Sequence, residues 1–302
     1  MGRHRSRSRP HGQREIGEEN LQQDATVTSP NDRPTNPELQ RIWLPLLRTL
    51  TAKYPSWGVW KNPESAFIGP GDIDSLAPPQ QWDDIEETFR DWATDNGFSP
   101  IVVCRHVPQG PHFVTVAPDW PHMLILDVKE LSTWRGSTLI DYKDLANVAI
   151  VEERGFRRVR PGAEGVVKLV LNGVLIGGRM NEEGLRTKGV RDLLSGDREG
   201  VAMVAEWFGP LKGVVLDGVD AVIAGGWDRR AMATLELFST ARSVLEPRTA
   251  ASRLWFKHYG VKKCGVLQSV RGEHRAIAGD TEEWARRIAV NHEVDLQPGV
   301  RP

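Results

Sequence analysis

Apolar residues recur at helical spacing where the polar N-terminal stretch of the chain ends. Asn36 is a favoured helix cap, and Pro37 is a favoured first helical residue. Apolar side chains then follow three and four positions apart, at Ile42, Trp43, Leu46, Leu47 and Leu50. The pattern predicts a helix that begins after Asn36, and we expect Pro45 to kink or divide it.

The following stretch predicts several strands and one amphipathic helix. Apolar residues at helical spacing, ended by Gly97, predict the helix over residues 83–96. Short apolar runs between turn residues predict strands over residues 57–61, 72–76, 101–107, 112–116 and 122–128. The last run, HMLILDV, is strongly apolar, as a central strand would be.

Beyond about residue 140 the pattern becomes mostly helical. It predicts helices over residues 141–152, 163–175, 183–195, 199–207, 228–245, 248–258 and 281–290. We therefore expect an α/β (α+β) fold, with a twisted mixed sheet and flanking helices over residues 37–150. A helical C-terminal domain would cover residues 151–295, followed by a short tail over residues 296–302.

Residues 1–36 are basic and polar and offer almost nothing to bury, so we expect a disordered tail. Its opening, MGRHRSRSRP, would allow a contact with RNA or DNA, and a solvated tail is the alternative. No apolar stretch follows this opening, as a secretory signal would require.

Composition narrows the class of protein further. The 302 residues are 39% hydrophobic and 26% charged, which is typical of a globular protein. A net charge of −1 disfavours long nucleic acids as partners. The two cysteines suggest no disulfide framework, and no apolar run approaches the roughly 18–20 residues that span a bilayer. We expect a cytoplasmic protein that does not bind membranes.

The segment Gly69-Pro70-Gly71-Asp72-Ile73-Asp74 is where the sequence points most clearly to chemistry. In a strand, residues two apart project to the same side, about 6.6 Å apart along the chain. Asp72 and Asp74 would therefore lie together, and two carboxylates this close repel each other unless a cation lies between them. The pair predicts a divalent metal site at the edge of the sheet. A polar turn is the alternative, because Pro-Gly-Asp is common in turns.

A third carboxylate, Asp127, ends the apolar run of the predicted central strand. A buried acid needs a partner, because burying an unpaired charge is costly. A metal shared with Asp72 and Asp74 would supply that partner, whereas a salt bridge at the end of the strand is the alternative. Mg²⁺ suits such a site because it binds carboxylate oxygens together with substrate phosphates.

A Gly-rich turn, an acid–apolar–acid strand and a third acid on a nearby strand together resemble the DNA polymerase beta-like nucleotidyltransferase superfamily. The resemblance covers roughly residues 55–130. It implies Mg²⁺ or Mn²⁺ bound by Asp72, Asp74 and Asp127, and nucleotide contacts at Gly69 and Gly71. Many members carry a Gly-Ser pair before the acids that holds the nucleotide phosphates. Here Val59-Trp60-Lys61-Asn62 takes its place, as in a subset of bacterial members.

By this resemblance the chain would transfer a nucleoside monophosphate from a nucleoside triphosphate (NTP) to an acceptor, with release of pyrophosphate. Asp72 and Asp74 would bind both metals, and Asp127 would bind one and take the acceptor's proton. Lys61 would hold the triphosphate, although an exposed strand lysine is the alternative. Candidate acceptors are a small molecule, a protein side chain or an RNA end such as that of a tRNA.

The stretch over residues 152–160 is rich in arginine. Its Arg157 and Arg158 are candidates for binding the triphosphate or an anionic acceptor. A solvated charge run, paired with Glu152 and Glu153, is the alternative.

The sequence is also compatible with other classes of function. The fold can lose catalysis and remain a binding module, or it can serve a toxin or defence system that modifies a host macromolecule. A zinc site at Cys104, His106, His112 and His122 is disfavoured, because no second close pair of ligands is visible. We expect Cys104 to be a small core residue.

Overall fold

The first helix, α1 (Pro37–Lys53), begins where its capping residue predicts. The Asn36 side chain accepts a hydrogen bond of 2.9 Å from the backbone N–H of Glu38. Pro45 lies inside the helix and does not divide it. Burial of Leu46, Leu47 and Leu50 beyond the proline holds the helix against the sheet, which outweighs the lost backbone hydrogen bond.

The computed structural model describes residues 36–69, 71–99, 101–107, 109–117, 123–185, 187–255 and 274–278. The tail predicted over residues 1–36 lies outside these ranges except for Asn36, and the helix predicted over residues 281–290 and the tail predicted over residues 296–302 lie outside them entirely. No helix among the described residues has the length and apolar character needed to cross a membrane.

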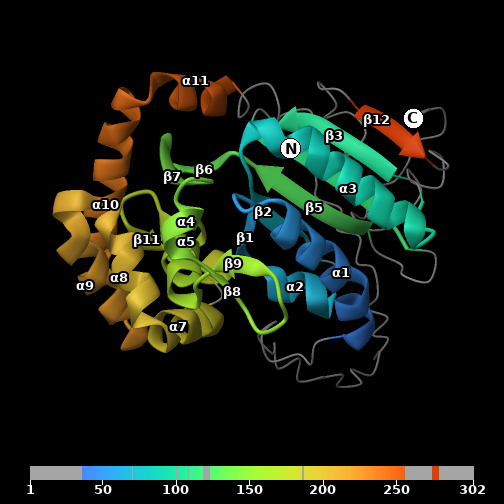
Figure 1. Cartoon of the computed structure of the whole chain (residues 1–302). Helices are drawn as coiled ribbons and strands as arrows, with labels where there is room; N and C mark the ends of the chain where they lie inside the picture. The colour runs from blue at the N-terminus through green and yellow to red at the C-terminus, as the bar shows by residue number, and fades with distance from the viewer. Residues whose placement is uncertain are drawn as a thin grey trace, which may run out of the picture.

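A mixed eight-stranded sheet, most of whose strands come from the first half of the chain, has the order β12-β3-β4-β5-β2-β1-β9-β8 (Figure 1). The strands are β1 (Gly58–Lys61), β2 (Ile73–Leu76), β3 (Ile101–Val107), β4 (Gly110–Val116), β5 (Met123–Lys129), β8 (Ala149–Val151), β9 (Arg157–Val159) and β12 (His274–Ala278). β5 lies in the middle, parallel to β2 and antiparallel to β4. The apolar run around Leu124 and Leu126 thus forms an inner strand, as predicted.

Helices α1, α2 (Pro63–Ile68) and α3 (Trp82–Asp95) cover one face of this sheet (Figure 1). Their apolar side chains pack with those of alternate strand residues in one buried cluster. On β5 the residues facing this cluster are Leu124, Leu126 and Val128. The residues between them, among them Asp127, therefore face the opposite side of the sheet.

The remainder of the described chain is mostly helical, as predicted. It comprises a hairpin of β6 (Leu131–Trp134) and β7 (Ser137–Asp141), a small two-stranded sheet of β10 (Val174–Leu175) and β11 (Arg179–Met180), and a set of helices. The helices are α4 (Leu145–Val148), α5 (Pro161–Gly173), α6 (Glu182–Leu185), α7 (Thr187–Gly196), α8 (Arg198–Glu206), α9 (Lys212–Ile223), α10 (Arg229–Arg242) and α11 (Pro247–Trp255).

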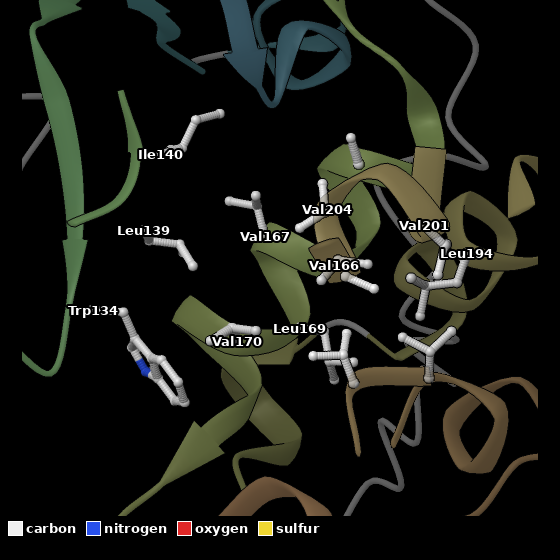
Figure 2. Close-up of a cluster of buried hydrophobic side chains, with 14 of the residues drawn as sticks. Trp134, Leu139, Ile140, Val166, Val167, Leu169, Val170, Leu194, Val201 and Val204 are labelled. Carbon is white, nitrogen blue, oxygen red and sulfur yellow. The ribbon is translucent and has the colours of Figure 1, made fainter. Parts of the chain in front are cut away.

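The helical region packs around α5. Figure 2 shows apolar side chains of α5, α7, α8 and the hairpin, which belong to one buried cluster. Trp60 of β1 and Leu76 of β2 belong to the same cluster. The helical region and the sheet thus share a hydrophobic core.

One helix predicted from the sequence, over residues 141–152, is wrong. This stretch instead contains the end of β7, the short α4 and β8. The Asp141 carboxylate accepts a hydrogen bond from the N–H of Lys143, and the Asp144 carboxylate accepts one from Asp141. Such local bonds compete with helix formation, and Ile150 and Val151 favour a strand. Helix α9 was not predicted.

Candidate functional site

Three carboxylates meet on the face of the sheet opposite α1 and α3. Asp74 on β2 lies directly beside Asp127 on β5 in the parallel pairing of these strands. Asp72 lies two residues before Asp74, and one oxygen of each of the three carboxylates lies within 4.8 Å of the others. Ile73 points the other way, into the core under the helices. The alternation expected for a strand therefore produces the acidic triad Asp72–Asp74–Asp127.

Two members of the triad are almost inaccessible to solvent. Asp74 is 2% exposed and Asp127 is 3% exposed, whereas Asp72 is half-buried. Asp74 Oδ2 and Asp127 Oδ1 are buried oxygens without a hydrogen-bond partner. An ionised carboxylate oxygen in this state is costly unless a cation reaches it.

The acidic pair continues into a row of polar residues across four neighbouring strands. Lys61 of β1 is the cross-strand partner of Asp74, and His112 of β4 is the partner of Asp127. The Lys61 Nζ lies 3.3 Å from Asp74 Oδ2, and the His112 Nε2 lies 3.4 Å from Asp127 Oδ1. Lys61 is therefore a partner of the triad and not an exposed strand lysine. A basic residue flanks each buried acid.

A further cation, Lys129, lies on the same face of β5 as Asp127, two residues later. Its Nζ donates a hydrogen bond to Asp127 Oδ2 and lies 4.0 Å from Asp74 Oδ1. Although burial disfavours its charged form, the charges of Asp127 and Asp74 raise the pKa of Lys129 above 10.5. The ammonium of Lys129 is thus a permanent charge beside the triad at neutral pH.

The two buried acids have very different pKa values. Burial, reinforced by the neighbouring charges of Asp72 and Asp127, raises the pKa of Asp74 to about 7. Burial would raise the pKa of Asp127 too, but His112 and Lys129 lower it to about 2. Asp127 is therefore ionised at neutral pH, whereas Asp74 is only partly ionised without a further cation.

Gly71 places Asp72 at the site through a close backbone approach. A Cβ added at Gly71 would lie 2.5 Å from the carbonyl carbon of Ser65 in α2, which is closer than real atoms approach. A Cβ at Gly69 would meet nothing within 4 Å. The turn before β2 thus requires glycine at position 71 and tolerates other residues at position 69.

The end of β1 is held by a buried carboxylate from α5. Asn62 adopts a left-handed conformation, with φ of 56°, and its backbone N–H donates a 2.9 Å hydrogen bond to Glu164 Oε1. The Lys61 ammonium lies 4.8 Å from the centre of the Trp60 ring. These contacts fix the direction in which β1 presents Lys61 to Asp74.

Arg157 and Arg158 form contacts with other parts of the protein and not with the triad. The Arg157 guanidinium donates hydrogen bonds to the backbone carbonyls of Tyr54 and Trp57. Arg158 forms a buried ion-pair network with Glu64, Glu152 and Glu164. The described structure therefore brings Lys61, Asp72, Asp74 and Asp127 together, and it places these two arginines in separate structural contacts.

The donor set of the triad fits a hard divalent cation. Three carboxylates, two of them with a buried oxygen that accepts no hydrogen bond, match the oxygen ligands that Mg²⁺ and Mn²⁺ prefer. Within the described part of the chain, this is the only group of three or more acidic, His or Cys side chains able to hold a metal ion.

Cys104 is buried in an apolar cluster with Val102 and Val114, as predicted for a small core residue. Burial raises the pKa of the Cys104 thiol to about 11. The thiol therefore stays protonated at neutral pH. Of the histidines considered for zinc, His112 lies beside Asp127 and His122 lies outside the described residues.

Two residues of the site, Lys129 and His112, were not predicted as partners of the acids. The spacing of Lys129 carried a usable signal, because a residue two positions after Asp127 must share its face of the strand. His112 became a neighbour only through the pairing of β4 with β5, which no local pattern reveals.

Comparisons with protein-family models, with curated proteins and with solved structures find no match to this chain. The candidate function therefore depends on the site alone: a mixed sheet with a buried acidic triad that could hold a metal.

Proposed function

We propose that this protein is a metal-dependent nucleotidyltransferase, which moves a nucleoside monophosphate from an NTP to an acceptor and releases pyrophosphate. The observation that carries the proposal is the geometry of the acidic triad on two adjacent parallel strands, with a buried oxygen that accepts no hydrogen bond on each of two carboxylates. The resemblance of the Gly-rich turn and the acid–apolar–acid strand to the DNA polymerase beta-like superfamily supports it.

In this proposal Asp72, Asp74 and Asp127 hold Mg²⁺ or Mn²⁺. When bound, the metal neutralises charge on the triphosphate and on the departing pyrophosphate. An oxygen of the acceptor attacks the α-phosphorus, the bond from that phosphorus to the pyrophosphate oxygen breaks, and the acceptor loses its proton. The resemblance to the superfamily assigns acceptance of that proton to Asp127. Lys61, fixed by its strand beside Asp74, binds the triphosphate.

The acceptor class is a small molecule, a protein side chain or an RNA end. The net charge of −1 argues against a long nucleic acid, because binding many phosphates needs clustered Lys and Arg. Arg154 and Arg158, which would form a basic patch from sequence, pair with Glu64 and Glu152. This internal pairing favours an acceptor that brings few phosphates.

The test is transfer of label from α-³²P-labelled NTPs to a component of a cell lysate. Purified protein with Mg²⁺ or Mn²⁺ is compared with the Asp72→Ala/Asp74→Ala variant and with Glu87→Ala, whose side chain is exposed on α3. We expect the wild type and Glu87→Ala to label an acceptor and the double variant to label none. Equal labelling by the double variant would contradict the proposal.

A second candidate, a non-catalytic binding module, is favoured by one observation. Lys129 donates a hydrogen bond to Asp127 and lies 4.0 Å from Asp74, so its ammonium provides a positive charge without a metal. In a site that has lost catalysis, the Lys129 ammonium would stabilise the two buried carboxylates permanently. Metal binding separates the two candidates, because the module would show no Mg²⁺- or Mn²⁺-dependent binding at the triad.

A further inference from the structure

Lys129 contacts both buried acids of the triad. Its Nζ bonds Asp127 Oδ2 and lies 4.0 Å from Asp74 Oδ1. Lys61 contacts the other Asp74 oxygen, Oδ2, at 3.3 Å. The two lysines thus approach Asp74 through different oxygens, and Lys129 is the one that also contacts the second buried acid.

The charges already present at the site oppose the binding of a metal ion without a nucleotide. The three carboxylates bring at most three negative charges, and Lys61 and Lys129 bring two positive charges. A divalent ion added beside both lysines would make the cations exceed the anions. At separations near 4 Å, repulsion between the ion and an ammonium would oppose binding strongly in a buried site. The negative charges of a triphosphate would remove that excess.

Lys129 can leave the triad without disturbing the sheet. Its backbone is fixed, since Lys129 pairs with Leu76 of β2 and its carbonyl accepts a 2.9 Å hydrogen bond from Ala77. Its side chain is 22% exposed and sits on the last residue of β5, so its flexible four-carbon stem has a route toward solvent. Rotation about the side-chain bonds would move the ammonium away from the carboxylates while the backbone stays in place.

We infer that Lys129 is a resident counter-cation of the triad, which the metal displaces and which then binds a phosphate of the incoming nucleotide. Metal and nucleotide would consequently bind together and each alone only weakly, because binding either one requires the charge balance that the other supplies. This inference rests on the proposed function, since it assumes a metal and an NTP at the same site. It assigns Lys129 a role that Lys61 does not share, because only Lys129 would be displaced from the acids by the metal.

The test is Mn²⁺ binding to the full chain, measured by electron paramagnetic resonance with and without the α,β-methylene analogue of each NTP. For the wild type we expect an analogue to tighten Mn²⁺ binding by about tenfold or more. For Lys129→Met we expect Mn²⁺ alone to bind about tenfold more tightly than to the wild type, with little further gain from the analogue. Lys129→Arg keeps the charge and should keep the weak binding of Mn²⁺ alone.

The controls separate this inference from the proposed function. Asp72→Asn/Asp74→Asn should abolish Mn²⁺ binding, and circular dichroism checks that each variant is folded; Lys129→Gln replaces Lys129→Met if the latter is not. If Mn²⁺ binds at the triad but neither neutral variant strengthens its binding, the counter-cation role is wrong and the proposed function stands. If Mn²⁺ binds to no variant with or without an analogue, both are wrong.

Discussion

Among the carboxyl groups of the site, Asp74 is the one whose ionised form is most strongly disfavoured. Its pKa is raised from an ordinary value of 3.8 to about 7, first by burial and then by Asp72 and Asp127. Between these two pH values the folded chain holds a proton that the unfolded chain has lost. The free energy of unfolding of the metal-free protein should therefore fall as the pH rises from about 4 to about 7.

Chemical denaturation in the presence of a chelator, at about pH 5 and about pH 8, measures this loss. Asp74→Asn should remove most of it, whereas Glu87→Gln on the exposed side of α3 should not. Asp127 does not obscure the result. Its folded pKa of about 2 lies below its ordinary value, so its contribution is lost only as the pH falls below about 4. A profile for Asp74→Asn that matches the wild type would exclude a raised pKa at this residue.

The acids of the site could be predicted from sequence, whereas their neighbours could not. Asp72 and Asp74 share a face because of a two-residue period, and Asp127 ends an apolar run; both facts are local. That Asp127 lies beside Asp74, and that His112 follows in the same row, depends on which strands pair and in which register. No pattern within one strand encodes that information.

At the level of elements, the turn between α2 and β2 controls where Asp72 lies. Gly71→Ala would place a Cβ 2.5 Å from the backbone of Ser65, so the turn must move away from α2 and carry Asp72 with it. We expect this variant to weaken Mn²⁺ binding by about tenfold or more while the protein stays folded.

Gly69→Ala is the matched control, because it changes the same turn by the same methyl group. Its Cβ meets nothing within 4 Å, and its φ of −172° is extended backbone that alanine adopts freely. Mn²⁺ binding should stay at the wild-type level in this variant. Equal weakening by both substitutions would show that the turn is not held through Gly71.

A second feature that joins elements is the ion-pair network between β9 and α5, which should affect the stability of the protein. Arg158 and Glu164 are 7% and 2% exposed, and Glu164 also holds the backbone after Lys61. Arg158→Met leaves Glu164 with fewer partners in a buried place, which should cost about 3–5 kcal/mol of stability. The exposed pair of Arg198 and Asp220 provides the comparison, since Arg198→Met should cost less than about 1 kcal/mol. Urea denaturation of both variants measures the difference.

Helices were predicted correctly where apolar residues recur at regular helical spacing. Helix α9 was missed because its stability depends on packing against other helices. Helix α9 contains Gly213, Gly218 and several valines, all of which disfavour an isolated helix. A Cβ at Gly218 would lie 2.6 Å from the methyl group of Met232, so the glycine allows α9 and α10 to approach closely. The close contact stabilises a helix that its own composition does not predict.

For the whole molecule, the shared core makes a prediction about cooperativity. Trp60 and Leu76 of the sheet lie in the same buried cluster as Leu194 of α7. The domains expected over residues 37–150 and 151–295 should therefore unfold in one transition. Leu194→Ala, at a fully buried position, should lower the stability of the sheet and of the helices together by about 2–5 kcal/mol.

Hydrogen exchange followed by mass spectrometry reports both parts at once. In mild denaturant, peptides from β5 and α9 should lose protection together, and Leu194→Ala should accelerate both by the same factor. Leu237→Ala, at a residue that is 71% exposed, should accelerate neither. Earlier exchange confined to α7–α10 would instead indicate two independent domains.

The alternation along β5 has a consequence for misfolding. Leu124, Leu126 and Val128 point to the helices, and Ile125 and Asp127 point to the acidic face. A slip of the strand by one residue would bury Asp127 under the helices and bring leucines among the carboxylates. The buried carboxylates lower the stability of the native fold, but they also exclude the strand register that lies one residue away. A chain that folds therefore has the three carboxylates aligned as metal ligands.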